Sequence, residues 1–217
     1  MTAAISILLL LGLYLSSLLI SRKVGQFFYR LTHSHQTTIY LMALFFLPGT
    51  FIHEMSHLLA ATALGVRTET MELIPHLEEH GVVMGSVPVA KTDPIRRALI
   101  GAAPFLVGIS FLVAVSFWLT RYSSGWPQII LGTYLSFEIA NTCFASGRDM
   151  EGTLELVLVL TLITAVLYFV GINQPLKLIA GLAADNQNIL AMFNKLLVIP
   201  LGINMVFLAA TGLIRHR

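Results

Sequence analysis

Long apolar segments that alternate with short polar segments dominate the pattern of this chain. A helix needs about 20 mostly apolar residues to cross the hydrocarbon core of a bilayer. Six segments approach or exceed this length, and the polar residues between them are few. The pattern therefore predicts about six transmembrane helices, at residues 3–20, 38–64, 95–119, 128–145, 154–170 and 196–214.

One connection, between the second and third predicted helices, has a different pattern. Residues 68–73 alternate between apolar and polar side chains, and residues 81–87 form a second short run rich in valine. Alternation with a period of two is typical of a β-strand. Pro75 and the charged residues 76–80 separate the two runs. We therefore expect a small β-hairpin at the membrane surface after the second transmembrane helix.

The composition agrees with a membrane protein. Of the 217 residues, 56% are hydrophobic and only 11% are charged, whereas an average soluble domain has about 25% charged residues. The fold class expected is an all-α polytopic membrane protein, with residues 1–217 forming a single membrane domain that contacts the lipid bilayer. The net charge is only +2, and no basic run indicates binding to nucleic acid. Cys143 is the only cysteine, so an intrachain disulfide is excluded.

The distribution of lysine and arginine predicts the orientation, because cytoplasmic loops carry the excess of these residues. On the side that holds both predicted termini lie Arg67, Lys91, Arg96, Arg97, Arg148, Arg215 and Arg217. On the other side lie Arg22, Lys23, Arg30, Arg121, Lys177 and Lys195. The small excess on the first side predicts a multi-pass protein with both termini in the cytoplasm.

The second predicted helix carries the candidate chemistry. His53, Glu54 and His57 form an H-E-x-x-H pattern with apolar residues on both sides. Residues four apart lie on one face of a helix, so both imidazoles can bind one ion. Zn²⁺ binds imidazole nitrogen readily, and the neighbouring glutamate can act as a general base toward a water molecule. Ionisable groups at membrane depth are costly and usually functional, which favours a metal site over a purely structural cluster.

The residues alone leave the third metal ligand open. A catalytic zinc site has three protein ligands and one open position. The acidic residues in or near the later apolar segments are Glu138, Asp149, Glu151 and Glu155. Other histidines are weaker candidates. His33 and His35 have the spacing of a solvated loop, and His76 and His80 lie in a charged turn, so none of the four receives a role.

Three features together resemble the site-2 protease family of intramembrane zinc metalloproteases. They are the membrane-embedded H-E-x-x-H, the small-residue and proline motif Gly101-Ala102-Ala103-Pro104 in the next helix, and an asparagine followed eight positions later by an aspartate. The last pair, Asn141 and Asp149, resembles the family motif N-x-x-P-x-x-x-x-D-G. The resemblance covers residues 38–152, and residues 1–37 and 153–217 would be flanking spans.

The resemblance implies a role for each matched residue. His53, His57 and Asp149 would bind one Zn²⁺ ion, Glu54 would be the catalytic general base, and Asn141 would bind the substrate backbone. The chain differs from the family pattern where Phe144 replaces the proline, Arg148 an apolar residue, and Met150 the glycine. Because these differences surround Asp149, Glu138 is the alternative third ligand.

The function expected is hydrolysis of peptide bonds in or near transmembrane helices of other membrane proteins. The partners would be a transmembrane substrate and, as a filter, the membrane, the hairpin or a regulatory partner protein. One alternative is a non-proteolytic relative, a pseudoprotease that binds membrane proteins without cleaving them. Another is a metal transporter, which would need polar ligands along several helices rather than on two.

Overall fold

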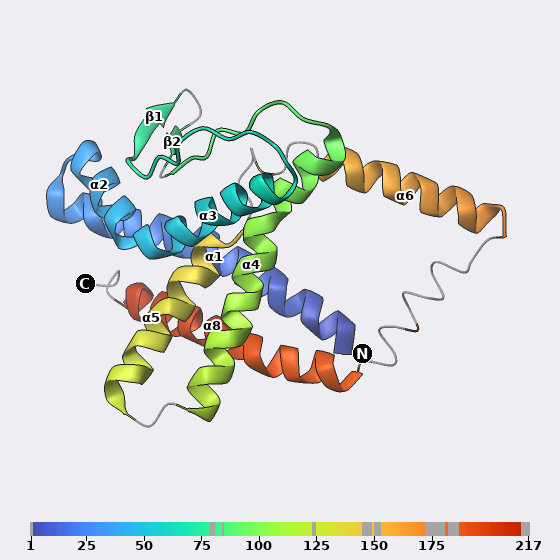
Figure 1. The fold of residues 1–217 in the computed structure, drawn as a ribbon. Coiled ribbons are helices and arrows are strands. Elements are labelled where there is room, and N and C mark those ends of the chain that lie inside the picture. Colours follow the sequence, from blue (N-terminus) through green and yellow to red (C-terminus); the bar gives the residue numbers. More distant parts are fainter. Residues whose placement is uncertain are drawn as a thin grey trace.

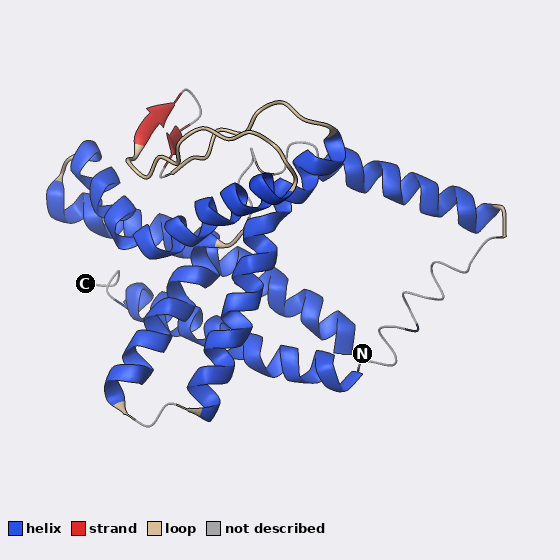
Figure 2. Cartoon of the chain, viewed as in Figure 1, coloured by secondary structure: helices blue, strands red, loops and turns tan. Residues whose placement is uncertain are grey.

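The computed structural model describes residues 2–78, 81–83, 85–122, 125–144, 149, 153–171, 181 and 187–213. In this part of the chain the fold is helical, apart from one small strand pair (Figure 1, Figure 2). The helices are α1 (Thr2–Thr32), α2 (His35–Phe45), α3 (Leu47–Ala63), α4 (Pro94–Arg121), α5 (Trp126–Thr142), α6 (Thr153–Phe169) and α8 (Gln187–Leu213).

The first and last described helices, α1 and α8, run side by side in the same direction. Ser6 Oγ donates to Asn194 Oδ1 at 2.6 Å. Further along the same two helices, Asn204 Nδ2 donates to Ser16 Oγ at 2.9 Å. Polar side chains commonly link helices in a membrane in this way, since hydrocarbon offers them no other partner. The two pairs therefore fix the register of α1 against α8.

The antiparallel helices α4 and α5 complete the core. A Cβ atom on Gly108 of α4 would strike the Cys143 side chain just after α5. At the other end of the pair, a Cβ atom on Gly132 would lie 2.5 Å from Leu119. Such close approach is typical of small residues at helix interfaces in membranes. The buried core cluster draws on α1, α4, α5 and α8 and is formed by Leu13, Leu112, Ile139, Ala140, Cys143 and Leu197.

The predicted count of six transmembrane helices is not supported. Among the described residues, only α1, α4 and residues Gln187–Thr211 of α8 are long and apolar enough to cross a membrane, and α2 and α3 together form a fourth candidate. Helices α5 and α6 have 17 residues each, which corresponds to about 25 Å at ~1.5 Å per residue. That length is shorter than the hydrocarbon core of about 30 Å. The described chain therefore has three or four candidate spans.

The predicted second span is broken into two helices. Helix α2 ends at Phe45, α3 begins at Leu47, and the two helices meet at an angle of 71°. Pro48 lies in the first turn of α3. It has no N–H to bond to the carbonyl of Leu44, so it ends α2 and starts α3. The proline thus causes a much larger change of direction than a kink within one helix.

The predicted hairpin between the second and third helices is not supported with the boundaries given above. The regular strands are β1 (His76–Glu78) and β2 (Gly81–Val83), which pair antiparallel, and residues 68–73 contribute only the single bridges Thr68–Val89 and Glu72–Ser86. Pro88 accepts a hydrogen bond from Glu69 N at 3.0 Å. Because proline has no N–H to return, a regular ladder cannot continue there.

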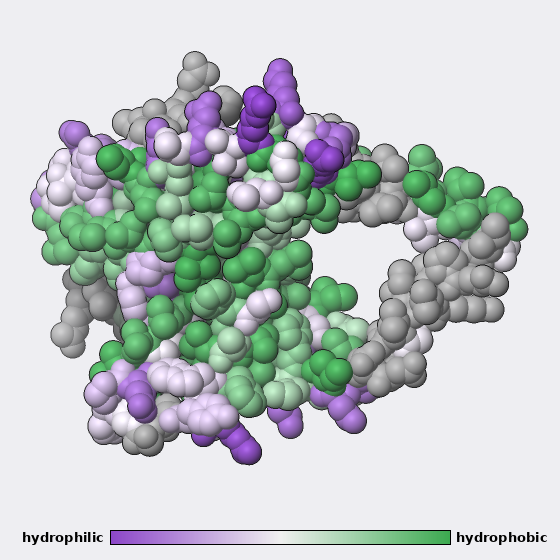
Figure 3. All heavy atoms as spheres, viewed as in Figure 1, coloured by the Kyte–Doolittle hydropathy of each residue, from purple (hydrophilic) through white to green (hydrophobic). Residues whose placement is uncertain are grey.

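Hydrophobic side chains form a band across the view in Figure 3, with hydrophilic residues gathered above and below it. Exposed Arg67, Lys91 and Arg96 belong to the connection between α3 and α4 and to the start of α4. Asp93 caps α4 by accepting a bond from Arg96 N at 3.0 Å, which lowers the pKa of its exposed carboxyl group. The band and the three or four apolar helices agree with a membrane protein.

Candidate metal site

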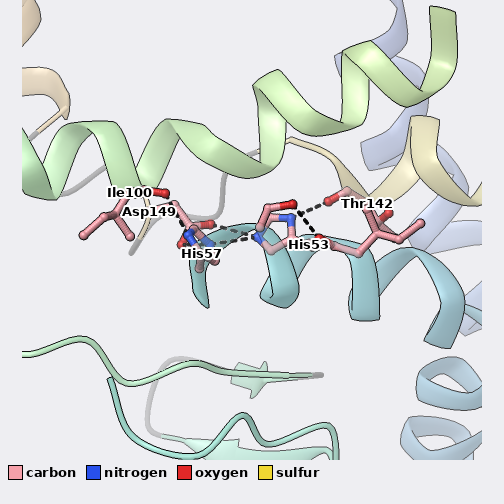
Figure 4. Close-up of polar contacts among 7 residues, drawn as sticks. His53, His57, Ile100, Thr142 and Asp149 are labelled. Carbon is pink, nitrogen blue, oxygen red and sulfur yellow. Dashed lines mark hydrogen bonds and ion pairs between the residues drawn. The ribbon is translucent and has the colours of Figure 1, made fainter. Parts of the chain in front are cut away.

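Helix α3 carries His53, Glu54 and His57, as the H-E-x-x-H spacing predicts. The two imidazole rings lie one turn apart with their centroids 5.0 Å from each other. Figure 4 shows both rings on the side of α3 that faces α4. The Nε2 atoms of the two rings lie 3.3 Å apart. One face of a single helix turn therefore presents two nitrogen ligands toward a common point.

Asp149 reaches the same point from the segment that follows α5. Its Oδ2 lies 3.3 Å from His53 Nε2, and its Oδ1 lies 3.1 Å from His57 Nε2. The three side chains are only 8–14% exposed. Their ligand atoms all lie within 4.8 Å of one another, so His53, His57 and Asp149 could hold a metal ion.

The separation of the two histidine nitrogens fits a tetrahedral ion, and the Asp149 carboxylate lies within reach of the same ion. Two ligands bonded tetrahedrally to one ion at about 2.0–2.1 Å lie about 3.3 Å from each other. The two histidine Nε2 atoms lie 3.3 Å apart, and each faces a different oxygen of the Asp149 carboxylate, at 3.3 and 3.1 Å. The donor set of two imidazole nitrogens and one carboxylate is also one that transition metals accept. The residues present therefore fit the metal that the sequence resemblance implies.

Glu138, the alternative third ligand, lies outside this group. Its side chain is completely buried on α5, and both carboxyl oxygens lack a hydrogen-bond partner among the described residues. The Gly49 N–H faces this carboxyl group without making a full hydrogen bond. The Glu138 carboxyl group therefore faces the start of α3, whereas the two histidines belong to the second and third turns of α3.

The remaining ring nitrogen of His53 is held by the end of α5. His53 Nδ1 lies 2.7 Å from the carbonyl oxygen of Thr142, the last residue of that helix. The last carbonyls of a helix have no partner within the helix. A carbonyl only accepts, so His53 Nδ1 donates and, in the neutral ring, Nε2 keeps its lone pair.

The same arrangement holds His57 from the other side. His57 Nδ1 lies 2.9 Å from the carbonyl oxygen of Ile100, which belongs to α4 (Figure 4). Metal-binding histidines usually donate their second N–H to a carbonyl or a carboxylate, and this bond fixes the ring orientation and the tautomer. Both Nε2 atoms are thus prepared as ligands by backbone groups of α4 and α5.

Gly49 explains how α5 comes close enough to α3. A Cβ atom at this position would collide with the Thr142 side chain and would lie 2.9 Å from the carbonyl oxygen of Glu138. Thr142 Oγ1 in turn donates to that carbonyl oxygen at 2.8 Å. Only glycine allows this contact, one turn before His53. The crossing of α3 and α5 therefore determines the distance between His53 and Thr142.

Glu54 is covered by the connection between α3 and α4. The residue is 7% exposed, and the Val87 N–H faces its carboxylate. A Cβ atom on Gly85 would lie 2.9 Å from Thr50 Cγ2 and 3.1 Å from Glu54 Cγ. Residues 85–87 therefore pack directly on the predicted general base. The sequence pattern predicts these residues to lie in the hairpin, but it gives no sign of this contact.

Asn141 is bonded into the helix bundle rather than into the metal group. Its Nδ2 donates to the carbonyl oxygen of Phe137 at 2.6 Å and to Asn204 Oδ1 of α8 at 3.0 Å. Asn204 continues the network to Ser16 of α1. The role of Asn141 in substrate binding stays a prediction, since in this structure its amide links α5 to α8.

The other histidines are placed as follows. The ring of His35 packs against Tyr29 with centroids 4.6 Å apart, at the connection between α1 and α2. His33 and His35 are not part of the metal group. His80 and the side chain of His76 lie outside the described residues. The metal group in the described chain is thus formed by His53, His57 and Asp149, with Glu54 beside it.

Comparison of the chain with protein-family models, curated proteins and solved structures gives no match.

Proposed function

We propose that this protein is an intramembrane zinc metalloprotease of the site-2 protease type. Its reaction would be hydrolysis of peptide bonds in or near the transmembrane helices of other membrane proteins. The observation that supports the proposal is the convergence of His53, His57 and Asp149 beside Glu54, in a chain with three or four helices that are apolar enough to cross a membrane. This is the residue set that the sequence resemblance implies for zinc and for the general base.

His53, His57 and Asp149 would hold the ion. Bound zinc supplies Lewis acidity and lowers the pKa of a coordinated water toward neutrality. Imidazole nitrogen favours zinc over magnesium or calcium, which prefer oxygen ligands. The Nδ1 bonds to Thr142 and Ile100 support this role, because they keep both rings in the orientation and tautomer that a metal requires.

Glu54 would act as the general base and then as the general acid. It follows His53 directly and lies close enough to both histidines and Asp149 to interact with them electrostatically. Its carboxylate would accept a proton from the attacking water and return it to the leaving amine nitrogen. The Val87 N–H, which faces the carboxylate, would hold the group in place between these two transfers.

The substrate would have to be unwound locally, because the peptide bonds of a helix are shielded by its own hydrogen bonds and side chains. We place the unwound segment beside residues 85–89. Because Gly85 has no side chain, its backbone lies directly against Thr50 and Glu54. The next residue, Ser86, forms an antiparallel bridge with Glu72. Extended backbone of this kind binds peptides by adding a strand.

The test is cleavage of a transmembrane substrate by the purified full-length chain in liposomes, with zinc content measured on the same samples. Glu54→Gln should keep the bound zinc and lose activity by about 10²- to 10⁴-fold, the usual effect of removing a general base. Glu138→Gln, a matched change at a buried glutamate outside the metal group, should keep both. Undiminished cleavage by Glu54→Gln would exclude the mechanism.

A second candidate function is favoured by the covering of Glu54. The Val87 N–H and the close approach of Gly85 restrict the carboxylate in this structure. A non-proteolytic relative that binds membrane proteins could keep the metal as a structural ion with this cover permanently closed. Such a protein would bind zinc and would not cleave any transmembrane segment, and Glu54→Gln would leave its binding of partners unchanged.

A further inference from the structure

We propose that Pro104 is a positioning residue for the metal site, because its missing N–H leaves the carbonyl of Ile100 free to accept from His57 Nδ1. This inference rests on the metal-binding role proposed above for His57. Pro104 lies inside α4, which continues from Pro94 to Arg121 without a break. In an α-helix each N–H bonds to the carbonyl four residues earlier. The residue that would normally bond to Ile100 is therefore residue 104.

Proline removes that bond in two ways. It has no N–H to donate, and its ring presses against the carbonyl four residues earlier and turns it away from the helix axis. Prolines persist in membrane helices where a neighbouring group satisfies the carbonyl that they free. At Ile100 this neighbour is present, since His57 Nδ1 lies 2.9 Å from the carbonyl oxygen.

The Ile100 carbonyl belongs to a residue buried between α3 and α4. Ile100 is only 4% exposed and packs with Ala61 and Val66 in the cluster that joins α3 to α4. Pro104 is itself almost completely buried. A buried carbonyl without a hydrogen bond is unfavourable. The pairing of Ile100 with His57 therefore satisfies a backbone acceptor and orients an imidazole at the same time.

Each histidine Nδ1 thus donates to a backbone carbonyl that has no partner in its own helix, and the reason for the missing partner differs between the two. Thr142 offers a free carbonyl because α5 ends there, and Ile100 offers one because Pro104 follows four residues later. With alanine at position 104, the new N–H would compete for the Ile100 carbonyl. The bond to His57 would weaken, and His57 would lose the constraint that directs Nε2 toward Asp149.

The experiment measures zinc affinity of the detergent-solubilised full-length chain by competition with a chelator. Loss of a partner to a metal-bound histidine typically lowers metal affinity by about 10- to 100-fold. Pro104→Ala should show a loss of this size. Pro200→Ala is the matched control, because Pro200 is a buried proline inside α8, which contributes no ligand. It should keep the wild-type affinity.

A third variant separates the missing N–H from the ring. Replacing Pro104 with lactic acid, the α-hydroxy counterpart of alanine, introduces a backbone ester that has neither an N–H nor a ring. This variant should bind zinc as the wild type does, and the absorption spectrum of its Co²⁺ form should match the wild-type spectrum, whereas Pro104→Ala should change both. If the alanine variant fails to fold, the ester variant still decides, since a tenfold loss there would overturn the inference.

The outcomes also separate this inference from the proposed function. Absence of zinc binding by the wild type would remove the proposed function and with it the role of His57. Zinc binding by the wild type with equal affinity in Pro104→Ala would leave the proposed function intact and reject the role of Pro104. A loss of affinity in Pro200→Ala equal to that in Pro104→Ala would also reject it, because the effect would then be a general one of helix bending.

Discussion

His53 and His57 face each other with their Nε2 atoms 3.3 Å apart, while the Nδ1 atom of each ring is bonded to a carbonyl oxygen. In the neutral rings both Nε2 atoms carry lone pairs, and two such atoms repel each other at this distance. A cation between them removes the repulsion, and Asp149 adds negative charge at the same point. The arrangement is therefore one that a metal ion would stabilise.

Asp149, rather than Glu138, should complete the metal site. Asp149→Ala removes the only carboxylate of the group, so zinc affinity should fall by more than about 100-fold, beyond the loss expected for an indirect partner. Glu138→Ala should keep zinc binding, since Glu138 does not belong to the group. Metal analysis of both folded variants after dialysis is the measurement. The opposite result would transfer the ligand role to Glu138.

Gly49→Ala should loosen the metal site through the contact between α3 and α5. The added methyl group would collide with Thr142 and approach the carbonyl of Glu138, and overpacking of this kind costs about 1–3 kcal/mol. The Thr142 carbonyl should then move away from His53 Nδ1, and zinc affinity should fall together with thermal stability.

Gly202→Ala is the control for that variant. A Cβ atom on Gly202 of α8 would meet nothing within 4 Å, and alanine is a better helix former than glycine by about 1 kcal/mol. This variant should be as stable as the wild type or more so, with unchanged zinc affinity. Equal zinc affinity in Gly49→Ala and Gly202→Ala would show that the close crossing does not position His53.

Asn141 and Asn204 should act as a pair in stability measurements. Each side chain bonds to the other across α5 and α8, and interhelical hydrogen bonds in membranes contribute about 0.6 kcal/mol on average and at most about 1.7. In a double-mutant cycle, Asn141→Ala and Asn204→Ala should therefore show a coupling energy within this range.

The same cycle bears on substrate binding by Asn141. If Asn141 contacts the substrate backbone, Asn141→Ala should raise the KM for a transmembrane substrate, whereas Asn204→Ala should not. Equal effects of both changes on stability, with KM unchanged in both, would leave Asn141 with a role in helix packing alone.

Gly85→Ala should lower cleavage without loss of metal. Its methyl group would press against Thr50 and Glu54, which would displace the base or lift residues 85–87 from it. The His53, His57 and Asp149 contacts do not involve Gly85. The measurement is kcat in liposomes together with zinc content. A loss of zinc in parallel with kcat would instead indicate that this connection supports the whole site.

The part of the site that the sequence predicted depends on helix geometry. His53 and His57 are four residues apart, and a helix brings such residues to one face whatever surrounds them. The third member of the group, Asp149, came from the resemblance to a family motif, and the structure brings it to the histidines where Glu138 stays apart. Neither the periodicity of the sequence nor its charge distribution distinguishes Asp149 from Glu138 as the third ligand.

The acceptors that hold the histidines could not be predicted in this way. Thr142 and Ile100 act through backbone carbonyls, which every residue has, so side-chain identity carries no signal. Pro104 was the one indirect sign, because it removes a defined hydrogen-bond donor from a defined turn. The sequence also predicted one span over residues 38–64 that is kinked at Pro48, whereas the chain turns there by 71° and forms two helices. The apolar pattern carries no signal for the size of that angle.

The pairing of α1 with α8 has a consequence for the order in which the protein is made. Ser6 and Ser16 find their partners in Asn194 and Asn204, each 188 residues later in the chain. Synthesis proceeds from the N-terminus, so α1 enters the membrane long before α8 exists. Helices α3, α4 and α5, which hold His53, His57 and their carbonyl acceptors, are all synthesised in the interval. The metal site can thus assemble before α8 is made, and α8 joins α1 beside it afterwards.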